Sequence, residues 1–150
     1  VQFRFEHKLS KVRLNIKTGA GFKGNHSELA GMTVALTGQQ TTADFDVLTD
    51  DEVAIAKGYE GIDLLTAENG RTSEGIVMPS NDYDGMQFEF RIEGHEPYVW
   101  ELNRSVNATR FDPGKEYIYN ITIHKTAIEV KATDIILCFH IFIGENGNAE

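Results

Sequence analysis

Glu116-Tyr117-Ile118-Tyr119-Asn120-Ile121-Thr122-Ile123-His124 is the stretch of sequence that decides the fold. Apolar or aromatic side chains occupy its odd positions, and mostly polar side chains occupy its even positions. This period of two predicts a β-strand with one face in a core. The expected core face carries Tyr117, Tyr119, Ile121 and Ile123.

The same alternation recurs on both sides of this stretch. Val12, Leu14 and Ile16 alternate with polar residues towards the N-terminus, and residues 127–133 and 135–143 form two further expected strands towards the C-terminus. Many short strands at regular spacing are typical of a sandwich or barrel, and no window has a helical period. We therefore predict one all-β domain over residues 1–150, an antiparallel sandwich of seven or more strands with almost no helix.

The apolar phase changes near the start of the chain. Phe3, Phe5 and His7 stand at odd positions, whereas the apolar residues from Val12 onwards stand at even ones. A shift of one residue turns every side chain of a strand to its other face. We therefore expect a bulge or sharp bend near Leu9-Ser10, and we expect His7 to face the core.

Composition excludes several classes of function. The formal net charge of −9 repels the phosphate backbone of nucleic acids, so no nucleic-acid partner is expected. Cys138 is the single cysteine, which rules out an internal disulfide. At 41%, the apolar fraction is ordinary for a globular domain.

The sequence contains no convincing catalytic or metal site. Cys138 and His140 would share a strand face, about 7 Å apart, which is too far for a nucleophile to bond its base. Asp82-Tyr83-Asp84-Gly85 is similar to the middle of a calcium loop, but Ser80 and Arg91 stand at its first and last ligand positions. We expect no enzymatic activity, no metal and no cofactor.

Aromatic side chains leave one binding hypothesis open. Tyr83, Tyr98 and Trp100 lie near loops in the middle of the chain, where an exposed row of rings would suit a glycan. Tyr98 and Trp100 share a strand face, which favours core packing over glycan binding. A monomeric surface glycan-binding module is kept as the alternative function.

Four segments also match one family's motifs in their order and spacing. They read FRFEHKLSKV at residues 3–12, LAGMTVALTG at residues 29–38, IVMP at residues 76–79 and FDPGKEYIYNITI at residues 111–123. Together they resemble the fimbrillin-like (Mfa-like) family of bacterial surface proteins.

This resemblance implies a transthyretin-like, Greek-key sandwich that forms the second, C-terminal domain of a longer two-domain lipoprotein precursor. It also implies export to the cell surface, in the outer membrane or fimbrium. The implied role is that of a structural or tip subunit of fimbriae (pili) that mediates cell adhesion. Its implied partners are other fimbrial subunits or itself, joined by β-strand exchange, and a host glycan or protein.

The expected assembly strands lie at the two ends of the chain. Residues 135–143 form a continuous apolar run, interrupted only by a thiol and an imidazole, which is typical of a strand covered on both faces. Such a strand lies either inside its own sandwich or against another copy. The candidate assembly residues are Phe3, Phe5, Ile135, Leu137, Phe139, Ile141 and Ile143.

Overall fold

A computed structural model describes residues 6–25, 27–44, 54–55, 60–102, 108 and 110–137. These ranges contain eleven strands and no α-helix, so they offer no helix that could cross a membrane. The strands are β1 (Ser10–Thr18), β2 (Thr33–Thr37), β3 (Ala43–Asp44), β4 (Ala54–Ile55), β5 (Ile62–Asp63), β6 (Leu65–Thr66), β7 (Thr72–Val77), β8 (Gln87–Arg91), β9 (Tyr98–Glu101), β10 (Lys115–His124) and β11 (Ala127–Leu137).

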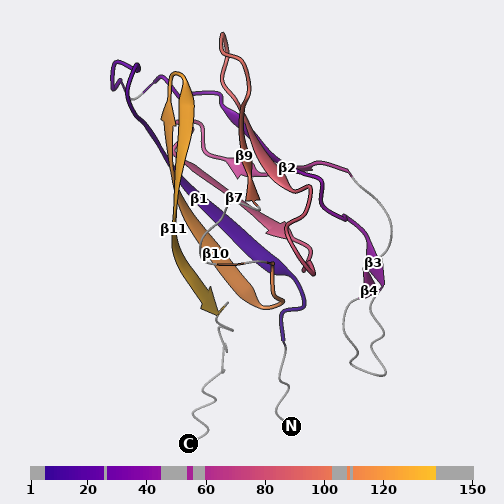
Figure 1. The fold of residues 1–150 in the computed structure, drawn as a ribbon. Helices are drawn as coiled ribbons and strands as arrows, with labels where there is room; N and C mark the ends of the chain where they lie inside the picture. Colours follow the sequence, from indigo (N-terminus) through magenta and orange to yellow (C-terminus); the bar gives the residue numbers. More distant parts are fainter. Residues whose placement is uncertain are drawn as a thin grey trace, which may run out of the picture.

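Two sheets form the predicted sandwich. One has five strands in the order β11-β10-β1-β7-β6, and the other has four in the order β5-β2-β8-β9, while β3 and β4 pair separately. Figure 1 shows β1 between β10 and β7, although β1 and β10 come from opposite ends of the sequence. These two strands run parallel, whereas the prediction made the whole sandwich antiparallel. The other described strand pairs are antiparallel.

The register of β1 on β10 explains the core. Val12 lies opposite Tyr117 and Leu14 opposite Tyr119, so the apolar faces of the two strands coincide. Aromatic packing connects the two sheets, because the ring of Trp100 in β9 contacts the ring of Tyr119 in β10 edge-on, with 4.9 Å between the ring centroids. The predicted core residues of both strands are buried: Val12, Leu14, Ile16, Tyr117, Tyr119, Ile121 and Ile123.

The C-terminal strands differ from the prediction. Where the sequence analysis placed two strands, at 127–133 and 135–143, the structure describes one strand, β11, over Ala127–Leu137, and residues 138–143 lie outside the described residues. Ile118 pairs with Asp134 but the next residue, Tyr119, pairs with Ala132, which leaves Thr133 as an extra residue in β11. Such a bulge accommodates one residue without ending the strand.

The bend expected near the start of the chain is present at Leu9, directly before β1. His7 is exposed, so the prediction that it faces the core is wrong. Its alternation with the preceding residues does not carry over, because residues 6–8 are not in a strand.

Candidate functional site

The structure places two of the candidate assembly residues on one sheet edge. Ile135 and Leu137 lie in the last three residues of β11, opposite Tyr117 and Lys115 of β10. β11 pairs only with β10 among the described strands, so it forms an edge of the five-stranded sheet. The remaining candidates lie outside the described residues: Phe3, Phe5, Phe139, Ile141 and Ile143.

The end of β11 is not covered by the sandwich. Ile135 is 41% exposed and Ile136 is 40% exposed, although they point to opposite faces of the strand. Of the two alternatives for this run, burial inside its own sandwich is therefore wrong for its described beginning. Two adjacent exposed isoleucines on an edge strand form a surface suited to pairing with another chain.

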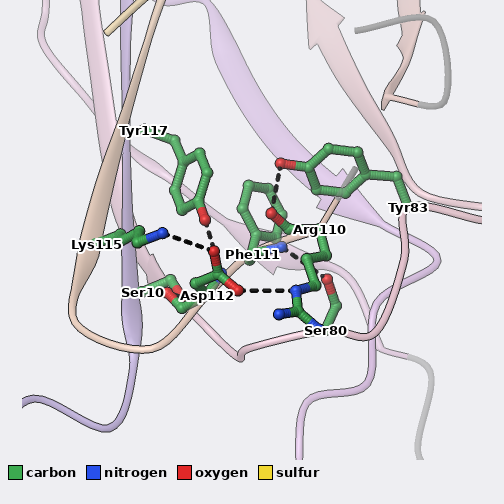
Figure 2. A network of polar contacts seen from close by, with 8 residues as sticks. All are labelled: Ser10, Ser80, Tyr83, Arg110, Phe111, Asp112, Lys115 and Tyr117. Atoms are coloured by element: carbon green, nitrogen blue, oxygen red, sulfur yellow. Dashed lines mark hydrogen bonds and ion pairs between the residues drawn. The ribbon is translucent and has the colours of Figure 1, made fainter. Parts of the chain in front are cut away.

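A polar network fixes the beginning of β10 beside this edge (Figure 2). Its centre is Asp112, whose carboxylate lies 2.8 Å from both Lys115 Nζ and Arg110 Nε. The backbone N–H of Asp112 donates to the Tyr117 hydroxyl at 2.7 Å, and its carbonyl accepts from Ser10 Oγ at 2.7 Å. One residue thus joins the loop before β10 to the first residue of β1.

Phe111 attaches the same loop to the chain after β7. Its backbone N–H donates to Ser80 Oγ at 3.1 Å, and the Ser80 N–H donates to its carbonyl at 2.9 Å. The Phe111 ring is fully buried and meets the rings of Tyr83 and Tyr117 at 4.8 and 5.0 Å. The Tyr83 hydroxyl donates to the Arg110 carbonyl at 3.1 Å (Figure 2).

The charges of this network are fixed at neutral pH. The hydrogen bond from Lys115, together with the charge of Arg110, lowers the pKa of Asp112, and the hydrogen bond to Asp112 raises the pKa of Lys115. Burial raises the pKa of the Tyr83 and Tyr117 hydroxyls. Within the described ranges, no three His, Cys, Asp or Glu side chains gather as metal ligands. The network therefore acts as an anchor for β10.

An open groove of about 670 Å³ lies on the outer face of the five-stranded sheet, at the same end. Residues 6–8 and Leu9, Ser10, Lys11, Ile76 and Glu116 line it. Leu9 is 42% exposed and Ile76 is 55% exposed. The sequence analysis missed this groove, although Ile76 and Val77 are consecutive in a strand and must face opposite sides.

Ion pairs cross the sheet beneath this groove. Lys11 Nζ lies 3.1 Å from Glu74 Oε2 and 3.7 Å from Glu116 Oε1, and Arg13 Nη2 lies 3.1 Å from Glu116 Oε1. The hydrogen bond from Lys11 lowers the pKa of Glu74. The two cations of β1 thus lie between one anion of β7 and one anion of β10, so the charges of these four side chains sum to zero.

The aromatic residues proposed for glycan stacking do not form an exposed row. Tyr83 and Trp100 are buried in the core, and Tyr98 packs partly against it. Trp100 stacks on Phe88 at 5.4 Å, and the Tyr98 hydroxyl donates to the Lys125 carbonyl at 3.1 Å. Core packing, which the sequence favoured for Tyr98 and Trp100, is therefore confirmed.

Comparison with known proteins gives a consistent result. A model of the family described as fimbrillin-like matches residues 1–135. A protein of Bacteroides uniformis named as fimbrium subunit Fim1C is 34% identical over all of this chain and 50% of its own length. The chain thus spans about half the length of this relative.

Two solved structures share the fold. A cell adhesion protein of Bacteroides uniformis superimposes with a TM-score of 0.82 and 34% identity, over 93% of this chain and 54% of that one. A cell adhesion protein of Bacteroides ovatus superimposes with a TM-score of 0.63 and 22% identity, over 88% of this chain and 46% of that one. The second likeness concerns the fold alone.

Proposed function

This chain belongs to the fimbrillin-like family, and from that premise we propose that it is a structural or tip subunit of a bacterial surface fimbria. In this role it is a non-enzymatic protein, exported to the cell surface and joined to other fimbrial subunits. The fimbrium subunit and the cell adhesion proteins to which it is similar support the proposal.

The observation that carries the proposal is the uncovered end of β11. An edge strand with exposed apolar residues on both faces invites a neighbouring strand, which gains main-chain hydrogen bonds and covers the side chains. The sequence continues beyond Leu137 with Cys138-Phe139-His140-Ile141-Phe142-Ile143, which needs cover as well. We therefore propose that subunits join by exchanging or pairing a strand, through residues 135–143 or through the Phe3–Phe5 segment.

The proposal includes a place for this domain in a longer protein. Because the relatives are about twice as long, we propose that residues 1–150 form the C-terminal domain of a two-domain precursor, anchored at the outer membrane. The burial of Tyr83 and Trp100 removes the surface on which the glycan-binding alternative depended, so we do not propose that alternative.

Truncation tests the strand proposal. Deleting residues 138–150 keeps all of β11, whereas deleting residues 144–150 removes only the polar tail and serves as the control. We expect the full chain and the control to self-associate in multi-angle light scattering, and the larger truncation to be monomeric. A parallel variant, Phe3→Ser with Phe5→Ser, tests the N-terminal segment. A full chain that stays monomeric at high concentration contradicts strand exchange, as does undiminished association in both test variants.

A further inference from the structure

We propose that Gln39, Asp82 and Asp84 hold a calcium ion that ties the loop after β2 to the loop between β7 and β8. The three residues line one pocket of about 230 Å³. This pocket shares no residue with the groove beside β1 or with the edge of β11. Binding there is a property of the single domain, whatever way subunits join.

A buried oxygen without a partner is the observation that points to a ligand. Gln39 is 1% exposed, and its Nε2 donates a hydrogen bond to the Met78 carbonyl at 2.6 Å. This bond fixes the orientation of the amide, because only its nitrogen can donate. Among the described residues, Gln39 Oε1 has no hydrogen-bond partner. A buried acceptor in this state is unfavourable, so a ligand that coordinates it stabilises the pocket.

The charge of the pocket favours a cation as that ligand. Its lining contains two carboxylates, Asp82 and Asp84, and no Lys, Arg or His. Asp82 Oδ1 accepts the backbone N–H of Asp84 at 2.9 Å, and this bond uses one of the two Asp82 carboxylate oxygens. Carboxylate and amide oxygens are the ligands that Ca²⁺ prefers. Ca²⁺ takes about 6–8 oxygens in a flexible arrangement, and waters complete the set.

Two glycines bring the loops together before any ion binds. Gly38, directly before Gln39, has a φ of +76°, and a Cβ at this position would collide with the Gly85 carbonyl. Gly85 has a φ of +71° and lies in a turn in which the Met86 N–H donates to the Tyr83 carbonyl at 3.0 Å. Tyr83 is itself buried. The turn therefore presents the carboxylates on either side of a fixed residue.

The pocket adds a ligand that the loop alone lacks. Ser80 and Arg91 occupy the first and last ligand positions of the calcium-like loop, and the sequence analysis expected no metal for that reason. In the structure Arg91 is paired with Glu89 and lies outside the lining of the pocket. Gln39 comes from a separate loop, so spacing within residues 80–91 could not identify it.

The small number of charged ligands sets the affinity. Asp82 and Asp84 are both exposed, and only two carboxylates take part. Such a site should resemble extracellular calcium modules, whose dissociation constants are about 10⁻⁴–10⁻³ M. It fills only where calcium is close to millimolar. The ion would therefore join the two loops at the cell surface, the location proposed above.

A calcium titration of the whole chain tests the site. Starting from chelator-treated protein, about 10 mM CaCl₂ should raise the thermal midpoint by about 3–6 °C if the dissociation constant is about 1 mM. Isothermal titration calorimetry should give one ion per chain. NaCl at the same ionic strength controls for screening of the net charge of −9.

Variants assign the ligands. Asp82→Asn with Asp84→Asn removes both charges but keeps an oxygen that can accept the N–H of residue 84. Gln39→Met keeps the length of the side chain and removes Oε1. The control, Asp63→Asn with Glu93→Gln, removes two charges from exposed residues outside the pocket. We expect the control to keep the calcium shift of the midpoint and both site variants to lose it.

The outcomes separate an ion from a water. An unmodified chain that does not respond to calcium, or that responds equally to NaCl, overturns the proposal and leaves Gln39 Oε1 to water alone. A calcium shift that survives in either site variant overturns the assignment of the residues removed. Circular dichroism shows whether each variant is folded, and the Asn pair decides if Gln39→Met is not. Failure of the calcium site leaves the fimbrial proposal intact, because the titration does not measure assembly.

Discussion

The inner and outer faces of the five-stranded sheet use similar residues but differ in what covers them. On the inner face, Leu14, Ile121 and their neighbours are sealed by the four-stranded sheet. On the outer face, Leu9, Ile76 and Ile136 stand exposed around a row of ion pairs. Side-chain type alone therefore does not decide burial here.

The inner face should govern stability, and the outer face should not. Ile121→Ala leaves a cavity in a fully buried strand and should lower the free energy of unfolding by about 2–5 kcal/mol. Ile76→Ala, on the exposed face, should change it by no more than about 0.5 kcal/mol. Urea denaturation of the chain that lacks residues 138–150, which we expect to be monomeric, measures both without a contribution from association. Equal midpoints for the two variants would show that the faces have been assigned wrongly.

A smaller difference in the free energy of unfolding is expected between two variants that each lack one tyrosine hydroxyl. Tyr117→Phe removes the acceptor of the Asp112 N–H in the anchor of β10, and should cost about 1–3 kcal/mol because that donor is left without its partner. Tyr98→Phe removes an exposed bond to the Lys125 carbonyl and a long contact with the His95 ring, and should cost clearly less. The two substitutions are chemically identical, so the ratio of their effects reports on burial. A larger loss for Tyr98→Phe in the same denaturation assay would contradict this ordering.

The smallest of these effects on stability should appear at acidic pH. In the folded chain, ion pairs hold the pKa values of Glu74 and Asp112 below their ordinary values of 4.5 and 3.8. A lowered folded-state pKa gives stability that is present above the ordinary pKa and is lost as pH falls through the folded one. We expect unfolding midpoints to be flat from pH 7 to about pH 5 and to decline below about pH 4.

Exposure of these pairs to solvent limits the size of the acid effect. The matched test is Glu74→Gln, which keeps the shape of the side chain but cannot titrate. Its stability should depend less steeply on pH below about pH 4 than that of the unmodified chain. An identical acid profile for the two proteins would show that the ion pairs on the outer face do not contribute.

The sequence predicts the elements whose signal is periodic. Alternation correctly identified the inward faces of β1 and β10, because a period of two describes any half-buried strand. It could not identify the parallel pairing of these strands, which depends on contacts between residues that lie far apart in the chain. It also divided β11 at Asp134, because the extra residue of a bulge breaks the alternation in the same way as a turn does.

The candidate site was predictable only in part. Of the residues in the continuous apolar run, Ile135 and Leu137 lie at a sheet edge, and their role in assembly stays a prediction. The groove was missed because its lining residues come from three separate strands and the segment before β1. Only the register of β7, β1 and β10 brings Ile76, Lys11 and Glu116 into one row. His7 was misassigned because a sequence pattern does not show where a strand begins.

The position of β1 in the sheet also determines when this protein can fold. β1 is made before β10, and the partner of its Asn15 is Asn120, which comes 105 residues later. Pairs so distant along the chain close slowly, because the entropy of the long intervening loop is lost before the contact forms. The ribosome must therefore release nearly the whole domain before the five-stranded sheet can close. Until then β1 can pair with β7, but it lacks the neighbour that joins the two ends of the domain.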